Sequence, residues 1–506
     1  MKKCLLFVLS LLSLTMISCE DIDNPINRET LHFDSFSFLK KDNPQLENDI
    51  ICEFASDSLV ELFILHAKTD SLIPSFTGNY DIVEVDGVQQ VSGVTSNDFN
   101  NAITYKLKGS NGEEKTIKFI IKGLNGIPRI IINTNNEDPI TSREDYVNGT
   151  IQILNAPEYP PINTSCRIRG RGNASWNHPK KSYKVKADAK ISPFGFPSNK
   201  DWVLLGNYTD KSLLRTAYVS ELSKAMGIKF TINYLMVELV LNGDYQGVYC
   251  FTDHVEKANN RINIDKDGYF IEDDTYYSRE PLFFKSDICG FNYTFKYPKP
   301  DDGEIIEGDE KYVFIKDYIN KMEGALQNIE ERDEFKNYVD IKSFAKYFVV
   351  GESTGNINPN RFYVLNNKSA KLESYPFWDA EWSFGLGRLV DNKWKKYPYE
   401  PMPTDEPFYE NYRYFKYLVK SSEFRKEVTK EWLAYKEKIP MVKQRLSEIR
   451  RSLNYAQKEN FGKWDVLGKY LDESLVAFET WEEEVDYIDR WFEDRLIWFD
   501  NYVRTW

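Results

Sequence analysis

Amide and carboxylate side chains recur between residues 352 and 387, at spacings that suit a metal ion. A loop carries Asn358 and Asn360, and an apolar run further along ends in Asp379-Ala380-Glu381. Side chains alternate between the two faces of a strand, so Asp379 and Glu381 are predicted to share one face at a strand end. Oxygen ligands of this kind hold Mg²⁺ on the phosphates of a nucleotide. We therefore predict a metal site at Asp379, Glu381 and Asn360; the alternative is a turn and a solvated strand end.

A basic segment lies upstream in this otherwise acidic chain. Residues 167–186 contain seven Lys or Arg and no acid, and glycines at 170 and 172 allow close backbone approach. Backbone N–H groups and cations together favour a polyphosphate. Lys181 is predicted to contact a nucleotide, because it shares a strand face with apolar positions. Lys184 is the second choice and Arg169 adds charge on the preceding strand; the alternative is a solvated basic hairpin.

Two glutamates are candidate partners for Lys181, the predicted nucleotide-binding lysine. Glu221 flanks the apolar stripe of a helix predicted over residues 211–226. Glu238 interrupts an apolar strand, and a buried carboxylate needs a partner. A further acidic group, at residues 272–274, follows another predicted strand, where it indicates either a cation site or a solvated strand end.

Several of these segments resemble motifs of the CotH family of atypical kinases. WDAEWSFG at 378–385 is similar to the family's W-D-x-D-x-x-F-G, and ESTGNINPNRFYV at 352–364 to its E-L-x-x-N-x-D loop. RGRGNASW at 169–176, KKSYK at 180–184 and VELVLNGDYQGVY at 237–249 also match. The resemblance spans roughly residues 128–387. It implies a two-lobed kinase-like domain that binds ATP with Mg²⁺ or Mn²⁺ and phosphorylates Ser or Thr of an unknown protein acceptor.

Two positions depart from the family pattern. Asn358 stands where the resemblance places the catalytic aspartate, and Glu381 replaces the second aspartate of W-D-x-D. Glutamate still binds a metal, but an amide does not accept a proton as a carboxylate does. With Asn358 at the catalytic position, slow transfer is expected. The alternative function is a catalytically impaired surface binding or adhesion protein.

The N-terminus and the composition indicate an exported protein. Lys2 and Lys3 precede an apolar run too short to span a membrane, and Cys19 follows at a lipobox-like site. We predict a lipid anchor at Cys19 and a location at the outer membrane or cell surface; an ordinary signal peptide is the alternative. The net charge of −13 argues against a nucleic-acid partner.

The predicted fold class is α+β, with an N-terminal β-sandwich followed by an atypical kinase-like two-lobed domain whose C-terminal part is helical. The chain of 506 residues is long enough for several domains. We expect a signal peptide at 1–18, a tether at 19–30 and an immunoglobulin-like β-sandwich at 31–126, where short strands alternate with turns. A CotH kinase-like domain at 128–400 and its helical extension at 401–506 follow. Helices are also predicted near 310–328, 331–338, 341–350, 410–419, 422–456 and 472–504.

Overall fold

The computed structural model describes residues 30–46, 49–52, 54–56, 58–62, 70–99, 101–121, 126–154, 156, 159–173, 175–356, 361–386, 389–390, 393–394, 403–471, 474 and 476–506. The predicted signal peptide and lipid-anchor residue Cys19 lie outside these ranges, as do Asn358 and Asn360. Within them, no helix has the length and apolar character needed to cross a bilayer.

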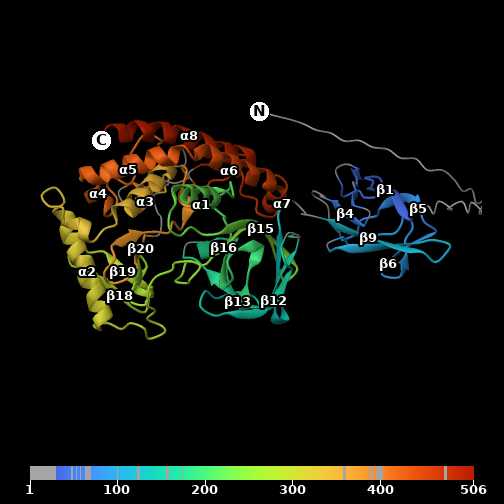
Figure 1. Cartoon of the computed structure of the whole chain (residues 1–506), viewed down its shortest axis with the longest axis horizontal. Coiled ribbons are helices and arrows are strands. Elements are labelled where there is room, and N and C mark those ends of the chain that lie inside the picture. Colours follow the sequence, from blue (N-terminus) through green and yellow to red (C-terminus); the bar gives the residue numbers. More distant parts are fainter. Residues whose placement is uncertain are drawn as a thin grey trace, which may run out of the picture.

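Two sheets lie at the N-terminal end of the described chain (Figure 1). They share one aromatic core. The ring of Phe36 lies 4.1 Å from that of Phe119 and 5.2 Å from that of Tyr105, so the sheets pack face to face, as in a β-sandwich. The smaller sheet has the order β2-β1-β5, with β1 (His32–Phe38), β2 (Ile50–Ile51) and β5 (Ser75–Asn79). The larger has the order β3-β4-β9-β8-β6-β7, with β3 (Phe54–Ser56), β4 (Leu59–Leu62), β6 (Ile82–Val85), β7 (Val88–Gln89), β8 (Ile103–Lys108) and β9 (Glu114–Ile121).

A closed barrel with its own core follows in the chain. Its order is β10-β11-β12-β13-β14-β16-β15, with β10 (Arg129–Thr134), β11 (Val147–Leu154), β12 (Ile162–Arg171), β13 (Ser182–Ile191), β14 (Asn199–Leu205), β15 (Tyr234–Leu241) and β16 (Asp244–Asp253). The parallel pair β10 and β15 closes it. Apolar residues alternate along the strands and fill the interior, which leaves every second side chain of β12 on the outer face.

A five-stranded antiparallel sheet, called the second sheet below, lies beside the barrel. Its strand order is β18-β19-β17-β20-β21. Its strands are β17 (Tyr269–Asp273), β18 (Phe283–Lys285), β19 (Asn292–Tyr297), β20 (Arg361–Leu365) and β21 (Leu372–Ser374). A short hairpin, β22 (Leu389–Val390) and β23 (Lys393–Trp394), follows.

The helices gather over the barrel and the second sheet, except α2, which lies beside β18 and β19 (Figure 1). They are α1 (Arg215–Met226), α2 (Glu310–Gln327), α3 (Ile341–Thr354), α4 (Phe415–Leu418), α5 (Ser422–Lys436), α6 (Ile439–Leu453), α7 (Ala456–Lys463) and α8 (Trp481–Arg504). The last helix, α8, contacts the segment 352–387 at two points. Arg495 forms a buried ion pair with Glu352, and the hydroxyl of Tyr487 donates to the carbonyl of Gly385 at 3.2 Å. The mixture of strands and helices and the helical C-terminal part confirm the α+β class.

Local signals predicted several element ends. Asn242 and Gly243 form the tight turn between β15 and β16, both with positive φ. Gly227 ends α1 in the left-handed conformation, at φ 72°. The side chain of Asp340 caps α3 by accepting from the N–H of Ser343. In each case the residue type acts on its immediate neighbours, so no distant contact is needed.

Several helix predictions are wrong in their bounds. Helix α8 begins at Trp481 rather than near 472, and within 410–419 only Phe415–Leu418 is an α-helix. Helix α1 begins at Arg215 rather than at 211, because the carboxylate of Asp210 accepts from its N–H and holds the preceding turn. Residues 331–338 contain only a 3₁₀ helix at Glu334–Asn337, since the chain then becomes extended and pairs with Leu372. The segment 422–456 is two helices, α5 and α6, and Pro440 occupies the first turn of the second.

Buried Lys180 gives a testable pH dependence of stability. Its side chain forms no ion pair with any described residue and donates to the carbonyl of Val248 and to Oδ1 of Asn460, and burial holds its pKa well below the ordinary value. The unfolded chain therefore binds a proton that the folded chain lacks, so Lys180 lowers stability increasingly as the pH falls below about 10.

We expect Lys180→Met to remove this slope. Between pH 10 and 7 the free energy of unfolding of the variant should gain on that of the wild type by up to about 1.4 kcal/mol per pH unit. Urea unfolding at several pH values measures it. Lys426→Met, on the exposed side of α5, is the matched control and should give no slope. A difference that is independent of pH would contradict the prediction.

Candidate functional site

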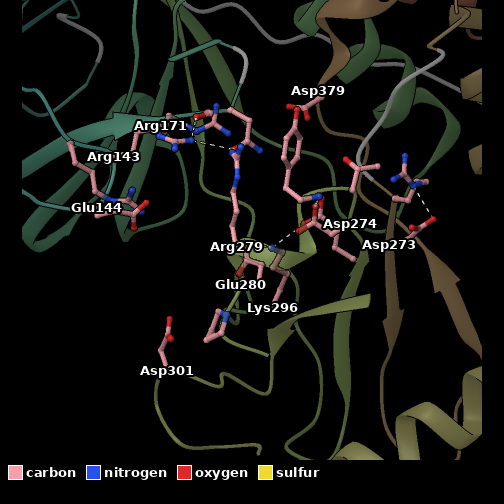
Figure 2. Close-up of a pocket in the computed structure, with 18 residues that line it drawn as sticks. Arg143, Glu144, Arg171, Asp273, Asp274, Arg279, Glu280, Lys296, Asp301 and Asp379 are labelled. Carbon is pink, nitrogen blue, oxygen red and sulfur yellow. Dashed lines mark hydrogen bonds and ion pairs between the residues drawn. The ribbon is translucent and has the colours of Figure 1, made fainter. Parts of the chain in front are cut away.

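A cavity of about 730 Å³ lies between the outer face of β12 and the end of β17 (Figure 2). Charged side chains dominate its lining. The basic ones are Arg143, Arg169, Arg171, Arg279, Lys296 and Arg361, and the acidic ones are Glu144, Glu272, Asp273, Asp274, Glu280, Asp301 and Asp379. The size suits a ligand as large as a nucleotide.

Two arginines enter the cavity from β12 because strand side chains alternate. Arg169 lies over the ring of Tyr146 at 5.1 Å, and Arg171 over the ring of Trp378 at 5.3 Å. Neither forms an ion pair with a described carboxylate, and Nε of Arg169 is buried without a hydrogen-bond partner among the described residues. These guanidinium groups keep unused donors toward the cavity.

A second pair of arginines meets on one neutral oxygen. Arg143, from the loop before β11, and Arg279, from the 3₁₀ turn after β17, donate to Oδ1 of Asn173 at 3.2 and 2.9 Å. Arg143 also donates to the carbonyl of Gly172 at 2.9 Å. Within the described chain neither arginine pairs with a carboxylate, so positive charge from the barrel and from the second sheet accumulates at this point.

The opposite wall is acidic and mostly neutralised. Asp273 accepts from Nε of Arg361 and from Nε of Arg413, each at 2.9 Å. Glu272 pairs with Lys296 at 2.9 Å, and its pKa is raised to about 7, chiefly by burial. The three acids at 272–274 are at most 9% exposed, so the alternative of a solvated strand end is wrong.

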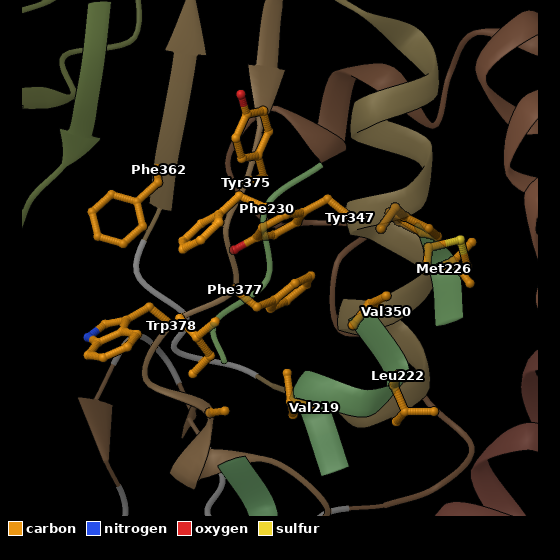
Figure 3. Packing of buried hydrophobic residues seen from close by; sticks show 14 of the residues in the cluster. Val219, Leu222, Met226, Phe230, Tyr347, Val350, Phe362, Tyr375, Phe377 and Trp378 are labelled. Carbon is orange, nitrogen blue, oxygen red and sulfur yellow. The ribbon is translucent and has the colours of Figure 1, made fainter. Parts of the chain in front are cut away.

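Asp379 lines the cavity, but not from a strand end as predicted. Strand β21 ends at Ser374, and Asp379 has φ 55° and ψ 53° and precedes a 3₁₀ helix at Ala380–Trp382. Phe377 and Trp378 are buried just before it, against a cluster that includes Tyr347 and Val219 (Figure 3). Packing of these aromatic side chains fixes the turn, so the expectation of a shared strand face for Asp379 and Glu381 is wrong.

The two carboxylates remain electrostatically coupled after this correction. Burial raises the pKa of Asp379 to about 6, and the charge of Arg171 opposes the shift. Burial and then the charge of Asp379 raise the pKa of Glu381 to about 7, while Arg171 opposes it. Arg171, Asp379 and Glu381 are therefore electrostatically coupled, although only Arg171 and Asp379 line the cavity and Glu381 does not.

The predicted nucleotide residues separate into two sets. Arg169 lines the cavity. Lys181 does not: its ammonium donates to the carbonyl of Trp176 at 2.6 Å and lies over that ring. Lys184 is also absent from the lining and pairs with Asp201 on β14 at 3.2 Å.

Neither glutamate meets a lysine from the basic strands. Glu221 accepts from the hydroxyl of Tyr234 at 2.8 Å and from Lys224, one turn along α1. Glu238 pairs with Arg129 at 2.8 Å across the parallel strands that close the barrel. The predicted pairing with Lys181 is therefore wrong for both, and both carboxylates stabilise local structure.

The Asn-rich loop begins beside Asp379. The amide of buried Asn356 donates to the carbonyl of Asp379 at 3.4 Å, which places the start of the loop at the site. Asn358 and Asn360 lie beyond the described part of the loop. Among the described residues no group of three or more His, Cys, Asp or Glu side chains is arranged to hold a metal ion by itself.

Sequence reasoning did not select several residues of this cavity. Arg171 lies on the same strand face as Arg169, so alternation along β12 could have identified it together with Arg169. Arg143 and Arg279 are isolated in the sequence, and no short motif could have joined them to Asn173.

The barrel, the second sheet and the helices define an α+β protein with a charged cavity between its two sheet systems. The model of the family described as CotH kinase protein matches residues 168–499, and the chain belongs to this family. The match confirms the family resemblance and extends through most of α8. The search of curated proteins found no match to the chain.

Proposed function

We propose that the protein binds ATP with Mg²⁺ or Mn²⁺ in this cavity and transfers the γ-phosphoryl group to Ser or Thr of a protein. The observation that carries the proposal is the meeting of arginines without carboxylate partners and of Asp379 in one cavity. Arginines bind phosphate oxygens through paired donors, and a carboxylate binds the metal that bridges them. The proposed two-lobed, kinase-like arrangement assigns the barrel to one lobe and the second sheet with its helices to the other.

The side chains fit a metal–polyphosphate ligand. Nε of Arg169 is a buried donor without a partner among the described residues, which a phosphate oxygen would satisfy. Asp379 would hold the metal, with Glu381 and the predicted Asn360 as further oxygen ligands. Mg²⁺ on a nucleotide usually takes only one or two protein carboxylates, because phosphates and water complete its shell. When bound, the metal would neutralise charge on the phosphates; Arg171 would orient them.

Calorimetric titration with ATP and Mg²⁺ tests the proposal, with Arg171→Gln as the first variant. We expect measurable affinity in the wild type and a loss of about tenfold or more in the variant, because a charge-assisted contact in a buried site contributes roughly 1.5–3 kcal/mol. The control Arg332→Gln, which changes an exposed arginine outside the cavity lining, should bind ATP as the wild type does. Absence of ATP binding by the wild type would reject the proposal and favour the alternative of a surface binding or adhesion protein.

We further propose that the protein acts outside the cytoplasm, anchored at the outer membrane or cell surface by lipid on Cys19. The lipobox-like sequence supports this location. The N-terminal sheets would serve as an immunoglobulin-like spacer between the anchor and the cavity. Mass spectrometry of the mature N-terminus would test it, since diacylglycerol on Cys19 is the expected modification.

A further inference from the structure

The end of β17 presents three consecutive carboxylates to the cavity, and their partners distinguish them. Asp273 accepts from two guanidinium groups, those of Arg361 and Arg413. Glu272 pairs with Lys296. Asp274 forms no ion pair with any described residue, although it is only 9% exposed and lines the same cavity. Of the three carboxylates, Asp274 is therefore the one that is not paired with a described cation.

Two hydrogen bonds hold Asp274 in place while leaving it able to accept others. Its Oδ1 accepts from the N–H of Tyr276 at 2.7 Å, and its Oδ2 accepts from the hydroxyl of Thr294 at a long 3.4 Å. Thr294 is fully buried on β19, so this wall of the cavity is fixed. A carboxylate has about four lone-pair sites, and two contacts leave room for a substrate hydroxyl.

Asp274 lines the same cavity as Arg171 and Asp379. The negative charges of Asp274 and Asp379 both contribute to the raised pKa of Glu272. Asp274 directly follows β17, and it accepts from Thr294, whose side chain shares a face with its cross-strand partner Glu272, so Asp274 lies on the same side of the sheet as Glu272. Asp274 and the proposed metal-binding residue Asp379 therefore line one cavity from different parts of the chain, the end of β17 and the turn after β21.

We propose that Asp274 is the general base of the phosphoryl transfer and supplies the carboxylate that position 358 lacks. This inference rests on the proposed function. The proton of the acceptor Ser or Thr hydroxyl passes to Asp274, and the acceptor oxygen forms a bond to the γ-phosphorus of a nucleoside triphosphate. The bond from that phosphorus to the β–γ bridging oxygen breaks, and the nucleoside diphosphate leaves with the electron pair.

The test compares Asp274→Asn with the wild-type full chain, using MgATP and dephosphorylated casein as a general acceptor. ATP affinity should stay within about twofold of wild type, while kcat should fall by about 100-fold or more, the usual contribution of a general base. Asp274→Glu keeps the carboxylate and should recover part of the rate. Added formate should partly rescue Asp274→Asn, an effect that a structural role would not produce.

Asp302→Asn is the matched control, because Asp302 is an exposed acid that does not line the cavity and should keep the wild-type rate. Wild-type turnover in Asp274→Asn would overturn the inference and leave the proposed function intact. A loss of turnover in Glu272→Gln but not in Asp274→Asn would have the same meaning. A wild type that binds MgATP without turnover also overturns it. A wild type that does not bind MgATP rejects the proposed function, and the inference with it.

Discussion

Asp379→Asn should weaken the binding of ATP in the presence of Mg²⁺ by at least about tenfold and should leave or improve binding in EDTA. Both expected changes in ATP affinity follow from the negative charge of Asp379. With metal present, the carboxylate is a ligand of the ion that bridges the phosphates. Without metal, the same charge repels the phosphates and competes with them for Arg171, which it attracts in the free protein. Calorimetry with MgATP and with ATP in EDTA measures both effects.

The control for this experiment is Asp317→Asn, an exposed carboxylate on α2 that pairs with Lys321 one turn away. It should bind as the wild type does under both conditions. Equal loss of affinity with and without Mg²⁺ in Asp379→Asn would mean that Asp379 supports the turn rather than the metal. Unchanged affinity in both conditions would remove Asp379 from the site.

Glu352→Gln should lower the free energy of unfolding by about 3–5 kcal/mol, the usual result of breaking a buried ion pair from one side. Glu352 and Arg495 are both fully buried, and the carboxylate also accepts from the N–H groups of Phe408 and Tyr409. The amide cannot neutralise Arg495, whose pKa burial already lowers to about 10 while Glu352 raises it. Urea unfolding followed by tryptophan fluorescence measures the loss.

A second variant separates the charge from the packing. Glu352→Gln combined with Arg495→Met removes both charges and should recover part of the stability, because the remaining cost is no longer an unpaired buried cation. Lys430→Met, which breaks an exposed pair on α5, should cost less than about 1 kcal/mol. A loss below 1 kcal/mol in Glu352→Gln would show that the buried pair contributes little to stability.

Features controlled by neighbouring residues could be predicted from the sequence. The Asn242-Gly243 turn and the cap at Asp340 depend on side-chain chemistry within four residues, and both are present. Membership in the family was predictable for the same reason, since its motifs are short and continuous. The location of Arg169 on an outward strand face followed from alternation along β12.

Features controlled by distant packing were missed. The left-handed conformation of Asp379 depends on burial of Trp378 and Phe377 against α1 and α3, which no local pattern encodes. Which basic side chains of the barrel line the cavity depends on β17, about 100 residues further along the chain. Only the side chains that face β17 line it, and these include Arg169 and Arg171 but not Lys181 or Lys184. A strand's alternation gives two faces, but the neighbouring sheet decides which part of a face becomes a site.

The contacts of α8 have a consequence for the order of events during synthesis. Its residue Tyr487 binds the carbonyl of Gly385, six residues after Asp379, and Arg495 neutralises Glu352 before the Asn-rich loop. A nascent chain on the ribosome has made the basic strands and the carboxylates long before residues 481–504 leave the exit tunnel. The contacts that α8 makes with both sides of the site therefore form only after these residues have left the tunnel, so the cavity reaches its final geometry late in synthesis.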